Sequence, residues 1–429
     1  MSAGARAKPH ASSKAAVLDA IRAAGTISRV GLVAATGFTG PTISALVRRL
    51  IEEGLVVETG RAESTGGKRR ILLQLNHTAR YAVGVHLDHG AMTYVLTDLA
   101  GTVVARIVRR GAGAEEPDTV VSRTAEEISR LIESIGVQRG RVLGVGLVSP
   151  GPRSSAPGVG LAPPTMRHWE GFPLGEALER ATGLPVVLDN DATAAALGEH
   201  WSGGFGGATS AAVVHLGTGI GAGLVINGIT YRGPNGNAGE FGHICVDMDG
   251  PECWCGARGC AEVMAGTAAV VTAVQADAAL AEAVGLGNRR RRVSTVADFA
   301  AISRAASRGE PGALALLERS ARYIAAAARS LANIMDLEVL VLTGPGFAIA
   351  GSVYLPVVQQ ELQRTAFSRA AQPVDVRLSR SAATASAVGA AALVLESELV
   401  PLSQAARLPE RLDAEPVALP YSLVASEVD

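Results

Sequence analysis

One histidine and three of the four cysteines lie close together between residues 240 and 262. Their spacing is H-x9-C-x-C-x4-C, and the residues are His243, Cys253, Cys255 and Cys260. A structural zinc site takes four nitrogen or sulfur ligands in a tetrahedron, all of them from the protein. The pattern predicts one structural Zn²⁺ per chain; the alternative is three buried thiols beside an unrelated histidine. The remaining cysteine, Cys245, is interpreted as a packing residue, with a substitute ligand as the alternative.

A second polar group stands at the end of an apolar strand. The run GLPVVLDNDATAAALGEHW places Asn190 and Asp191 between that strand and an alanine-rich helix. An amide and a carboxylate at a strand end suit a polyol, because both groups bind hydroxyls in bidentate fashion. The alternative is a helix N-cap, for which Asp191 is also well placed.

The elements that position these residues belong to a large chain. Its 429 residues exceed one simple core, since a domain commonly spans about 150 residues. No run approaches the roughly 18 apolar residues of a membrane span, and the first residues lack the apolar block of a signal peptide. Four cysteines, most of them spaced like ligands, do not make a disulfide framework. We therefore expect a cytoplasmic protein without a membrane partner.

Positive charge is concentrated at the N-terminus. Residues 1–76 hold 11 Lys and Arg against 5 Asp and Glu, whereas residues 77–429 hold 28 against 35. Phosphate neutralisation by Lys and Arg supplies most of the non-specific affinity for nucleic acid. The basic module suggests a nucleic-acid partner, and a merely solvated basic face is the alternative.

Three helices are predicted in this basic module, from residue 13 to a stop at Gly25, from 28 to 36, and over 41–54. This is helix-turn-helix spacing, in which the third helix enters the major groove by its N-terminal end. The residues expected at the DNA are Thr39, Pro41, Thr42, Ser44 and, at phosphates, Arg48.

Two short strands are predicted after the third helix, at residues 55–58 and 71–75. Their hairpin makes a wing whose tip carries Lys68 and Arg69, within reach of phosphate or a minor groove. Helix, turn, helix and basic wing together favour DNA binding over the alternative, a three-helix module for protein interaction.

The rest of the chain resembles a known family. After residue 76 come two apolar strands meeting at the turn Asp-Leu-Ala-Gly, a helix at about 117–135 and a buried strand, a succession repeated later. This succession resembles the duplicated lobes of actin-like sugar kinases. Together with Glu-Phe-Gly-His at 240–243 and Gly-Cys-Ala-Glu at 259–262, it makes the chain similar to the ROK family, from about residue 14 to 396. That family unites transcriptional repressors with sugar kinases.

The resemblance implies an α/β fold, in which a winged helix-turn-helix precedes a two-lobed, actin-like (ribonuclease H-like) body of the sugar-kinase type. We expect a DNA-binding domain at residues 1–76 and a first α/β lobe at 77–195. A second lobe with the zinc site follows at 196–400, with its closing helix available to pack on the first lobe. Residues 401–429 are expected to form a loose tail.

By the same resemblance, the sugar pocket consists of Asn190, Asp191, Glu240, His243 and Glu262. His243 would hold both the zinc and the sugar, because the two nitrogens of an imidazole point in opposite directions. Loss of the metal should therefore lose the ligand response. One contact of the family is missing, since Pro164 stands where the family usually has Asn.

The chain departs from the family's kinases at their first phosphate motif, Asp-x-Gly-Gly-Thr. Here His86 replaces the Asp, and Asp88 and His89 replace the two glycines. A glycine loop binds phosphate through bare backbone N–H groups, whereas a carboxylate and an imidazole repel or block a polyphosphate. The protein is therefore not expected to be an enzyme. The glycine turn at 217–221, which matches the second phosphate motif, is interpreted as a tight hairpin.

These features predict a sugar-responsive transcriptional regulator, a repressor of genes for carbohydrate uptake or metabolism. A homodimer or homotetramer would bind a double-stranded DNA operator, and a sugar or sugar phosphate would shift it between states of different operator affinity. Two alternatives stay open. One is a zinc-containing, ATP-dependent sugar kinase with Asp191 as general base, and the other is a regulator controlled by a protein partner.

Overall fold

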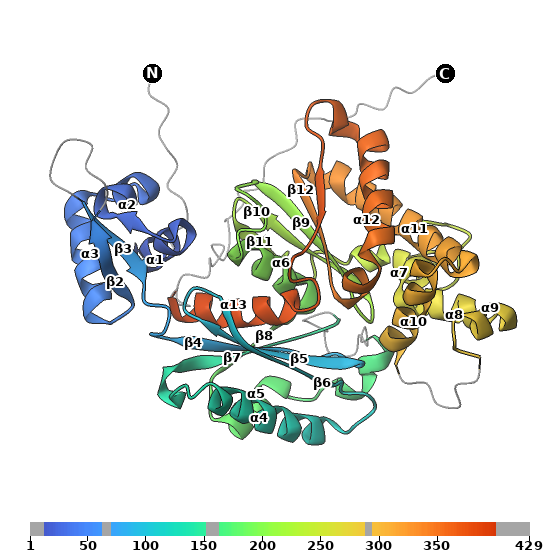
Figure 1. The fold of residues 1–429 in the computed structure, drawn as a ribbon, viewed down its shortest axis with the longest axis horizontal. Coiled ribbons are helices and arrows are strands. Elements are labelled where there is room, and N and C mark those ends of the chain that lie inside the picture. Colours follow the sequence, from blue (N-terminus) through green and yellow to red (C-terminus); the bar gives the residue numbers. More distant parts are fainter. Residues whose placement is uncertain (1–12, 62–69, 152–162, 288–293, 400–429) are drawn as a thin grey trace, which may run out of the picture.

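The computed structural model describes residues 13–61, 70–151, 163–287 and 294–399, as an N-terminal module and two lobes (Figure 1). Within these ranges no single helix is long and apolar enough to cross a membrane. The helices Arg29–Thr36 and Gly40–Glu52 reach the length and composition of a span when they are counted together, but the chain bends by 116° between them.

The N-terminal module contains three helices and a small antiparallel sheet. The helices are α1 (Ser13–Ala24), α2 (Arg29–Thr36) and α3 (Gly40–Glu52), and the strands lie in the order β1 (Ile27–Ser28), β3 (Ile71–Leu75), β2 (Val56–Arg61). Ser28 caps α2 by accepting from the Gly31 N–H, and Thr39 caps α3 by accepting from the Thr42 N–H. The helices pack on the sheet through side chains that are almost fully buried, among them Leu18, Ile21, Ile43, Leu50 and Leu73.

The first lobe is a five-stranded sheet in the order β6-β5-β4-β7-β8. Its elements are β4 (Tyr81–His86), β5 (Ala91–Asp98), β6 (Val103–Arg110), α4 (Pro117–Ser134), η1 (Arg139–Arg141), β7 (Val142–Ser149), η2 (Pro164–Trp169), α5 (Leu174–Thr182) and β8 (Val186–Asn190). The expectation of one strand before the Asp-Leu-Ala-Gly turn is wrong, because β4 and β5 are separate antiparallel strands. The chain reverses between them at Asp88, whose carboxylate accepts from the backbone N–H of His89.

The second lobe repeats this arrangement with the sheet order β11-β10-β9-β12-β13. Its strands are β9 (Ser210–Leu216), β10 (Ile220–Ile226), β11 (Ile229–Tyr231), β12 (Val339–Thr343) and β13 (Asp375–Leu378). Its helices are α6 (Asp191–Trp201), η3 (Phe241–His243), α7 (Ala261–Ala265), α8 (Thr267–Gln275), α9 (Ala278–Ala283), α10 (Thr295–Ser307), α11 (Pro311–Met335), α12 (Pro345–Thr365), η4 (Phe367–Ala370) and α13 (Ala385–Leu399).

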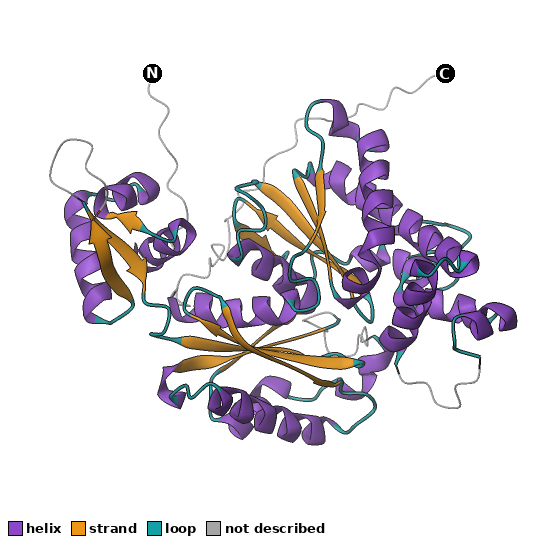
Figure 2. Ribbon diagram, in the orientation of Figure 1, coloured by secondary structure: helices purple, strands orange, loops and turns teal. Residues whose placement is uncertain are grey.

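The two lobes meet through a pair of helices. In Figure 2, helix α13 lies on one face of the first sheet, and α4 and α5 cover the opposite face. Helix α6 packs on β9 and β10 of the second sheet and also against α13. Helix α13 is therefore part of the layer between the lobes, and α6 leads from the end of β8 into the second lobe.

Small residues allow α13 to approach its neighbours closely. A Cβ at Gly146 of β7 would lie 1.8 Å from the carbonyl oxygen of Ala390, and a Cβ at Gly389 would lie 1.6 Å from that of Ala194 in α6. Backbone atoms of a packed helix cannot move aside as a flexible side chain does. These two glycines are therefore required where helix meets strand and helix meets helix.

We expect Gly146→Ala to lower the free energy of unfolding by about 2 kcal/mol, because overpacking of a core commonly costs 1–3 kcal/mol. The matched control is Gly140→Ala, since a Cβ at Gly140 would meet no atom of the described residues within 4 Å. Urea unfolding followed by circular dichroism measures both variants. Equal midpoints for the two variants would contradict the close approach of α13 to β7.

Candidate functional site

The four predicted metal ligands lie together in the second lobe. His243 ends η3, and the three cysteines lie in the following loop, up to the start of α7. Their ligand atoms are all within 4.8 Å of one another, with 3.6 Å between His243 Nδ1 and Cys253 Sγ and 3.8 Å between the Sγ atoms of Cys255 and Cys260. A tetrahedron with metal–sulfur distances of about 2.3 Å has edges of about 3.8 Å. Donor types and spacing both fit a Zn²⁺ ion.

The loop that carries these ligands depends on local backbone contacts. Gly259 has a φ of 62°, and a Cβ there would lie 1.5 Å from the Asp247 carbonyl oxygen, so glycine is required beside Cys260. Desolvation and hydrogen bonds with the neighbouring thiols raise the pKa of Cys260 to about 12. Metal binding would therefore release protons, because cysteine binds metal as thiolate. The interpretation of Cys245 as a packing residue is wrong, since it is exposed and lies outside the cluster.

Two acidic residues expected at the sugar stand on either side of this segment, Glu240 before η3 and Glu262 in α7. His243 Nε2, the nitrogen that does not face Cys253, lies 3.9 Å from Glu240 Oε2. Partial burial raises the pKa of the Glu240 carboxyl, and the nearby charges of Asp191 and Glu262 raise it further. The charge of His243 acts in the opposite direction. Glu262 accepts hydrogen bonds from Trp254 Nε1 at 2.6 Å and from the Ile220 N–H at 3.1 Å. Its carboxylate therefore connects the metal loop to strand β10.

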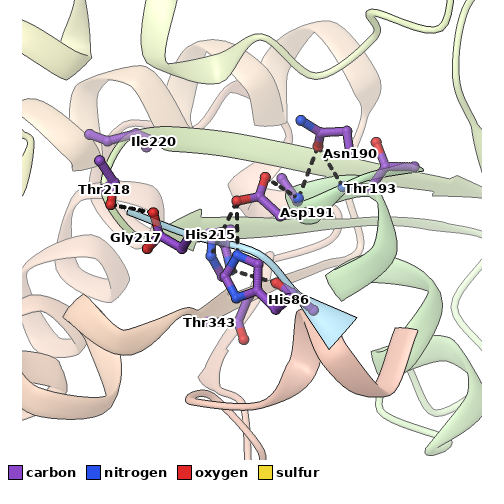
Figure 3. Close-up of polar contacts among 12 residues, drawn as sticks. His86, Asn190, Asp191, Thr193, His215, Gly217, Thr218, Ile220 and Thr343 are labelled. Atoms are coloured by element: carbon purple, nitrogen blue, oxygen red, sulfur yellow. Dashed lines mark hydrogen bonds and ion pairs between the residues drawn. The ribbon is translucent and has the colours of Figure 1, made fainter. Parts of the chain in front are cut away.

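Asn190 and Asp191 lie where β8 passes into α6 (Figure 3). The cap of α6 is Asn190, whose Oδ1 accepts from the N–H groups of Ala192 and Thr193 at 2.9 and 3.0 Å. Asn190 Nδ2 also donates to the Gly151 carbonyl oxygen at 3.1 Å. Because Asn190 already serves as the cap, Asp191 has an oxygen that faces away from the helix backbone.

That oxygen of Asp191 faces two histidines. His86 Nε2 at the end of β4 lies 3.3 Å from Asp191 Oδ2, and His215 Nε2 in β9 lies 3.9 Å from it. Burial alone would raise the pKa of Asp191, but the hydrogen bond with His86 and the charge of His215 hold it below its usual value. Burial lowers the pKa of His86, yet the bond to Asp191 and the charge of Asp88 outweigh that effect and raise it. Burial lowers the pKa of His215 to about 4.

The two segments that align with the phosphate motifs of the kinases are joined to each other. Asp88, in the turn after β4, accepts a 2.6 Å hydrogen bond from Thr218 Oγ1 in the glycine turn between β9 and β10. Asp88 is 4% exposed, and burial raises the pKa of its carboxyl. A polar contact between the lobes thus lies between these two turns.

The expected DNA-contacting residues of the third helix share one property, which is exposure to solvent. They are Thr39, Pro41, Thr42, Ser44 and Arg48, at the start and on the outer side of α3. The hydroxyls of Thr39 and Thr42 are 2.8 Å apart. Lys68 and Arg69 lie outside the described residues. Pro164 opens η2 and is exposed.

A contact between α1 and the body was not predicted. Arg22 Nη1 donates to the Trp201 carbonyl oxygen at 2.6 Å, and the Arg22 guanidinium lies 4.5 Å from the centre of the Trp201 ring. Trp201 Nε1 in turn donates to Glu396 of α13 at 3.3 Å. Trp201 is the last residue of α6, whose first residue is Asp191. One buried helix therefore connects the polar cluster to the N-terminal module.

Comparison with known proteins identifies the family. A profile described as the ROK family matches residues 82–397. The chain belongs to the ROK family. It is 30% identical to a putative xylose repressor of Caldicellulosiruptor sp. (strain Rt8B.4) over 376 residues, 87% of this chain and 93% of that protein.

Two solved ROK structures share the fold. A ROK family transcriptional regulator described as a homologue of the E. coli MLC protein superposes with a TM-score of 0.69 at 26% identity, over 90% of this chain and 96% of its own. A ROK glucokinase from Streptomyces griseus, in complex with glucose and AMPPNP, superposes with a TM-score of 0.60 at 29% identity, over 73% of this chain and 98% of its own. The two-lobed α/β body is thus of the type shared by ROK regulators and ROK kinases, as the sequence resemblance implied.

Sequence reasoning missed three residues that the fold brings to these sites. His215 stands in an apolar strand directly before a glycine turn, and a single histidine at that place could have indicated a site residue. Arg22 and Trp201 carried no signal, because they are 179 positions apart in the chain. Their contact follows only from the docking of α1 beside the end of α6.

Proposed function

We propose that this ROK protein is a sugar-responsive transcriptional repressor of genes for carbohydrate uptake or metabolism. Its N-terminal winged helix-turn-helix binds an operator as a homodimer or homotetramer. A sugar or sugar phosphate in the body changes the affinity for that operator. Two comparisons support this proposal. The chain is similar to a protein named a putative xylose repressor, and a ROK family transcriptional regulator superposes on 90% of the chain.

The N-terminal module supports DNA binding by its geometry. The exposed N-terminal turn of α3 presents Thr39, Thr42 and Ser44, which are short enough to let the helix approach base edges. Arg48 lies further along the same helix and is exposed, which suits a phosphate contact. The β2–β3 hairpin, with Lys68 and Arg69 in its connection, would serve as the wing.

The body supports sugar binding through acceptors that converge near the metal loop. The charges of Asp191 and Glu262 act on the Glu240 carboxyl, and Glu240 lies 3.9 Å from the nitrogen of His243 that does not face Cys253. A Zn²⁺ ion held by His243, Cys253, Cys255 and Cys260 would be structural, one per chain, since all four ligands come from the protein. Bound zinc would fix the orientation of the His243 ring and so of the donor at Nε2.

The contact between the two segments that align with the phosphate motifs of the kinases argues against a kinase. Kinase chemistry needs a nucleotide triphosphate between the two glycine turns. Here the buried Asp88 and the Thr218 hydroxyl bond to each other at that place, and the carboxylate would repel a phosphate. Asp191 then acts as a hydroxyl acceptor without acting as a general base.

Helix α6 is the single observation that carries the proposal. It begins at Asp191 in the sugar site and ends at Trp201. Arg22 of the DNA-binding module donates a hydrogen bond to the Trp201 carbonyl and lies over its ring. Residues Asp191 to Glu199 are all buried, so the helix cannot shift without moving its neighbours. A kinase gains nothing from such a connection, whereas a repressor requires one.

The test is calorimetry of the zinc-loaded protein against D-xylose, D-glucose, their phosphates and ATP. We expect one sugar or sugar phosphate to release heat and ATP to release none. In Asp191→Asn, the affinity for that sugar should fall about 10–150-fold, because a hydrogen bond to a charged group contributes about 1.5–3 kcal/mol. Asp118→Asn, an exposed change on α4, is the matched control and should bind as wild type.

The same protein is then titrated into duplex DNA selected from a random pool. Selection of a distinct sequence, with affinity changed by the sugar, supports the repressor. Binding of ATP together with a sugar would overturn it in favour of a kinase. Binding to DNA without any response to a sugar would point to control by a protein partner.

A further inference from the structure

His86, Asp191 and His215 form a second group of potential metal ligands, separate from the cysteine cluster. One ligand atom from each residue lies within 4.8 Å of those of the other two. The three side chains are 8%, 10% and 4% exposed. They come from the end of β4, the first turn of α6 and strand β9 (Figure 3), so the group spans both lobes.

Among the residues that the structure describes, the buried Nε2 atom of His215 has no hydrogen-bond partner. Asp191 Oδ2 lies 3.9 Å from this atom, which is beyond hydrogen-bond range. A buried polar atom without a partner is costly, because it has given up its bonds to water. Such an atom aimed at a carboxylate indicates that something is to bind between them.

Two further contacts prepare His215 for a ligand at Nε2. Its other nitrogen, Nδ1, lies 3.3 Å from the hydroxyl oxygen of Ser386 in α13, which is itself 2% exposed. An outer bond of this kind fixes the ring of a metal-binding histidine. On the open side stands Gly217, where a Cβ would lie 3.1 Å from His215 Nε2 and crowd this space.

We propose that His86, Asp191 and His215 bind a divalent first-row transition ion at the junction of the two lobes. Two imidazoles and one carboxylate are a recurrent ligand set for Zn²⁺ and Fe²⁺. Ligands about 2.1 Å from an ion are about 3.0–3.4 Å apart in octahedral or tetrahedral geometry. The 3.3 Å contact of His86 fits this spacing, and the 3.9 Å contact of His215 needs a closure of roughly 0.5 Å.

This ion would have a different role from the one held by cysteines. Three protein ligands leave at least one coordination position for water or for a hydroxyl of a bound ligand. Because Asp191 is also the proposed hydroxyl acceptor, the ion would lie beside the sugar. An ion bound by β4 and β9 at once would hold the two lobes together.

The test counts metal ions on the full-length protein after removal of metal and reconstitution with Zn²⁺. Mass spectrometry of the desalted protein should find two ions per chain for wild type and one for His86→Gln and for His215→Gln. Cys260→Ser should also retain one ion. The matched control, His168→Gln, changes an exposed histidine outside both groups and should keep two.

A titration with Co²⁺ tests the site without any variant. Thiolate ligands give Co²⁺ an intense charge-transfer absorption, whereas imidazole and carboxylate give only weak d–d bands. We expect the thiolate band to saturate after one equivalent while the weak bands continue to grow up to a second. One ion per chain in wild type, or a second ion that survives both histidine variants, would overturn the proposal. This count is independent of sugar and DNA binding, so it stands or falls apart from the proposed function.

Discussion

Cys260→Ser is expected to lose the metal of the cysteine cluster and, with it, the response to the sugar. The Cys260 thiol lies 3.8 Å from that of Cys255, and Cys260 directly precedes α7. Changes in the outer partners of metal ligands already cost about 10–100-fold in metal affinity, so loss of a ligand should cost more than about 100-fold. Without metal, the His243 ring has no fixed orientation beside Glu240.

Metal content is measured on the desalted variant, and sugar affinity is measured by calorimetry. We expect a fall of tenfold or more in sugar affinity, since a hydrogen bond to a charged group contributes about 1.5–3 kcal/mol. Cys245→Ser is the matched control, because that cysteine is exposed and lies outside the cluster. Unchanged sugar binding in metal-free Cys260→Ser would separate the pocket from the metal. An equal loss in Cys245→Ser would show a general sensitivity of the loop.

Much of the fold could be predicted because its signals are local. The helix expected at about residues 117–135 is α4, which spans Pro117–Ser134. Proline in the first turn, with an acidic residue beside it, indicates such a start within the sequence itself. The turn between β4 and β5 was missed because only Asp88, His89 and Gly90 separate two apolar runs. In the structure the Asp88 carboxylate accepts from the His89 N–H and from Thr218.

The two candidate sites differ in the same way, because one has a local sequence signal and the other has none. The cysteine cluster was predictable because its four candidate ligands lie close together in the sequence, and their spacing is the signal. The cluster of His86, Asp191 and His215 was not predictable, because its members come from three elements. His86 was noticed only as a departure from a phosphate motif. Its proximity to His215 depends on the way in which two sheets pack around α6 and α13.

The same reasoning explains why the connection from Asp191 to the N-terminal module could not be predicted from the sequence. A closing helix that could pack on the first lobe was expected, but its position became clear only from contacts such as Gly389 against Ala194. Helix α6 looked like an ordinary alanine-rich helix. Its significance comes from its two ends, which lie at different sites.

Arg22→Met is expected to uncouple sugar binding from operator binding. The substitution keeps the apolar stem but removes the bond to the Trp201 carbonyl and the charge over its ring. Coupling between sites is commonly about 1–3 kcal/mol, which is a change of about 5–150-fold in affinity. In Arg22→Met, the sugar should change operator affinity by less than about threefold, whereas sugar affinity and metal content stay unchanged.

Arg29→Met is the matched control, because it removes the same charge from the same module. Arg29 pairs with Glu58 at 3.0 Å within the module and does not bridge to the body through that pair. Operator affinity is measured by fluorescence anisotropy with and without saturating sugar, for both variants and wild type at one salt concentration. A full sugar response in Arg22→Met would exclude the contact at Trp201 as the route. Loss of the response in both variants would mean that the charge of the module matters more than the contact. Only selective loss in Arg22→Met assigns the coupling to α6, since ligand and DNA then bind normally but no longer influence each other.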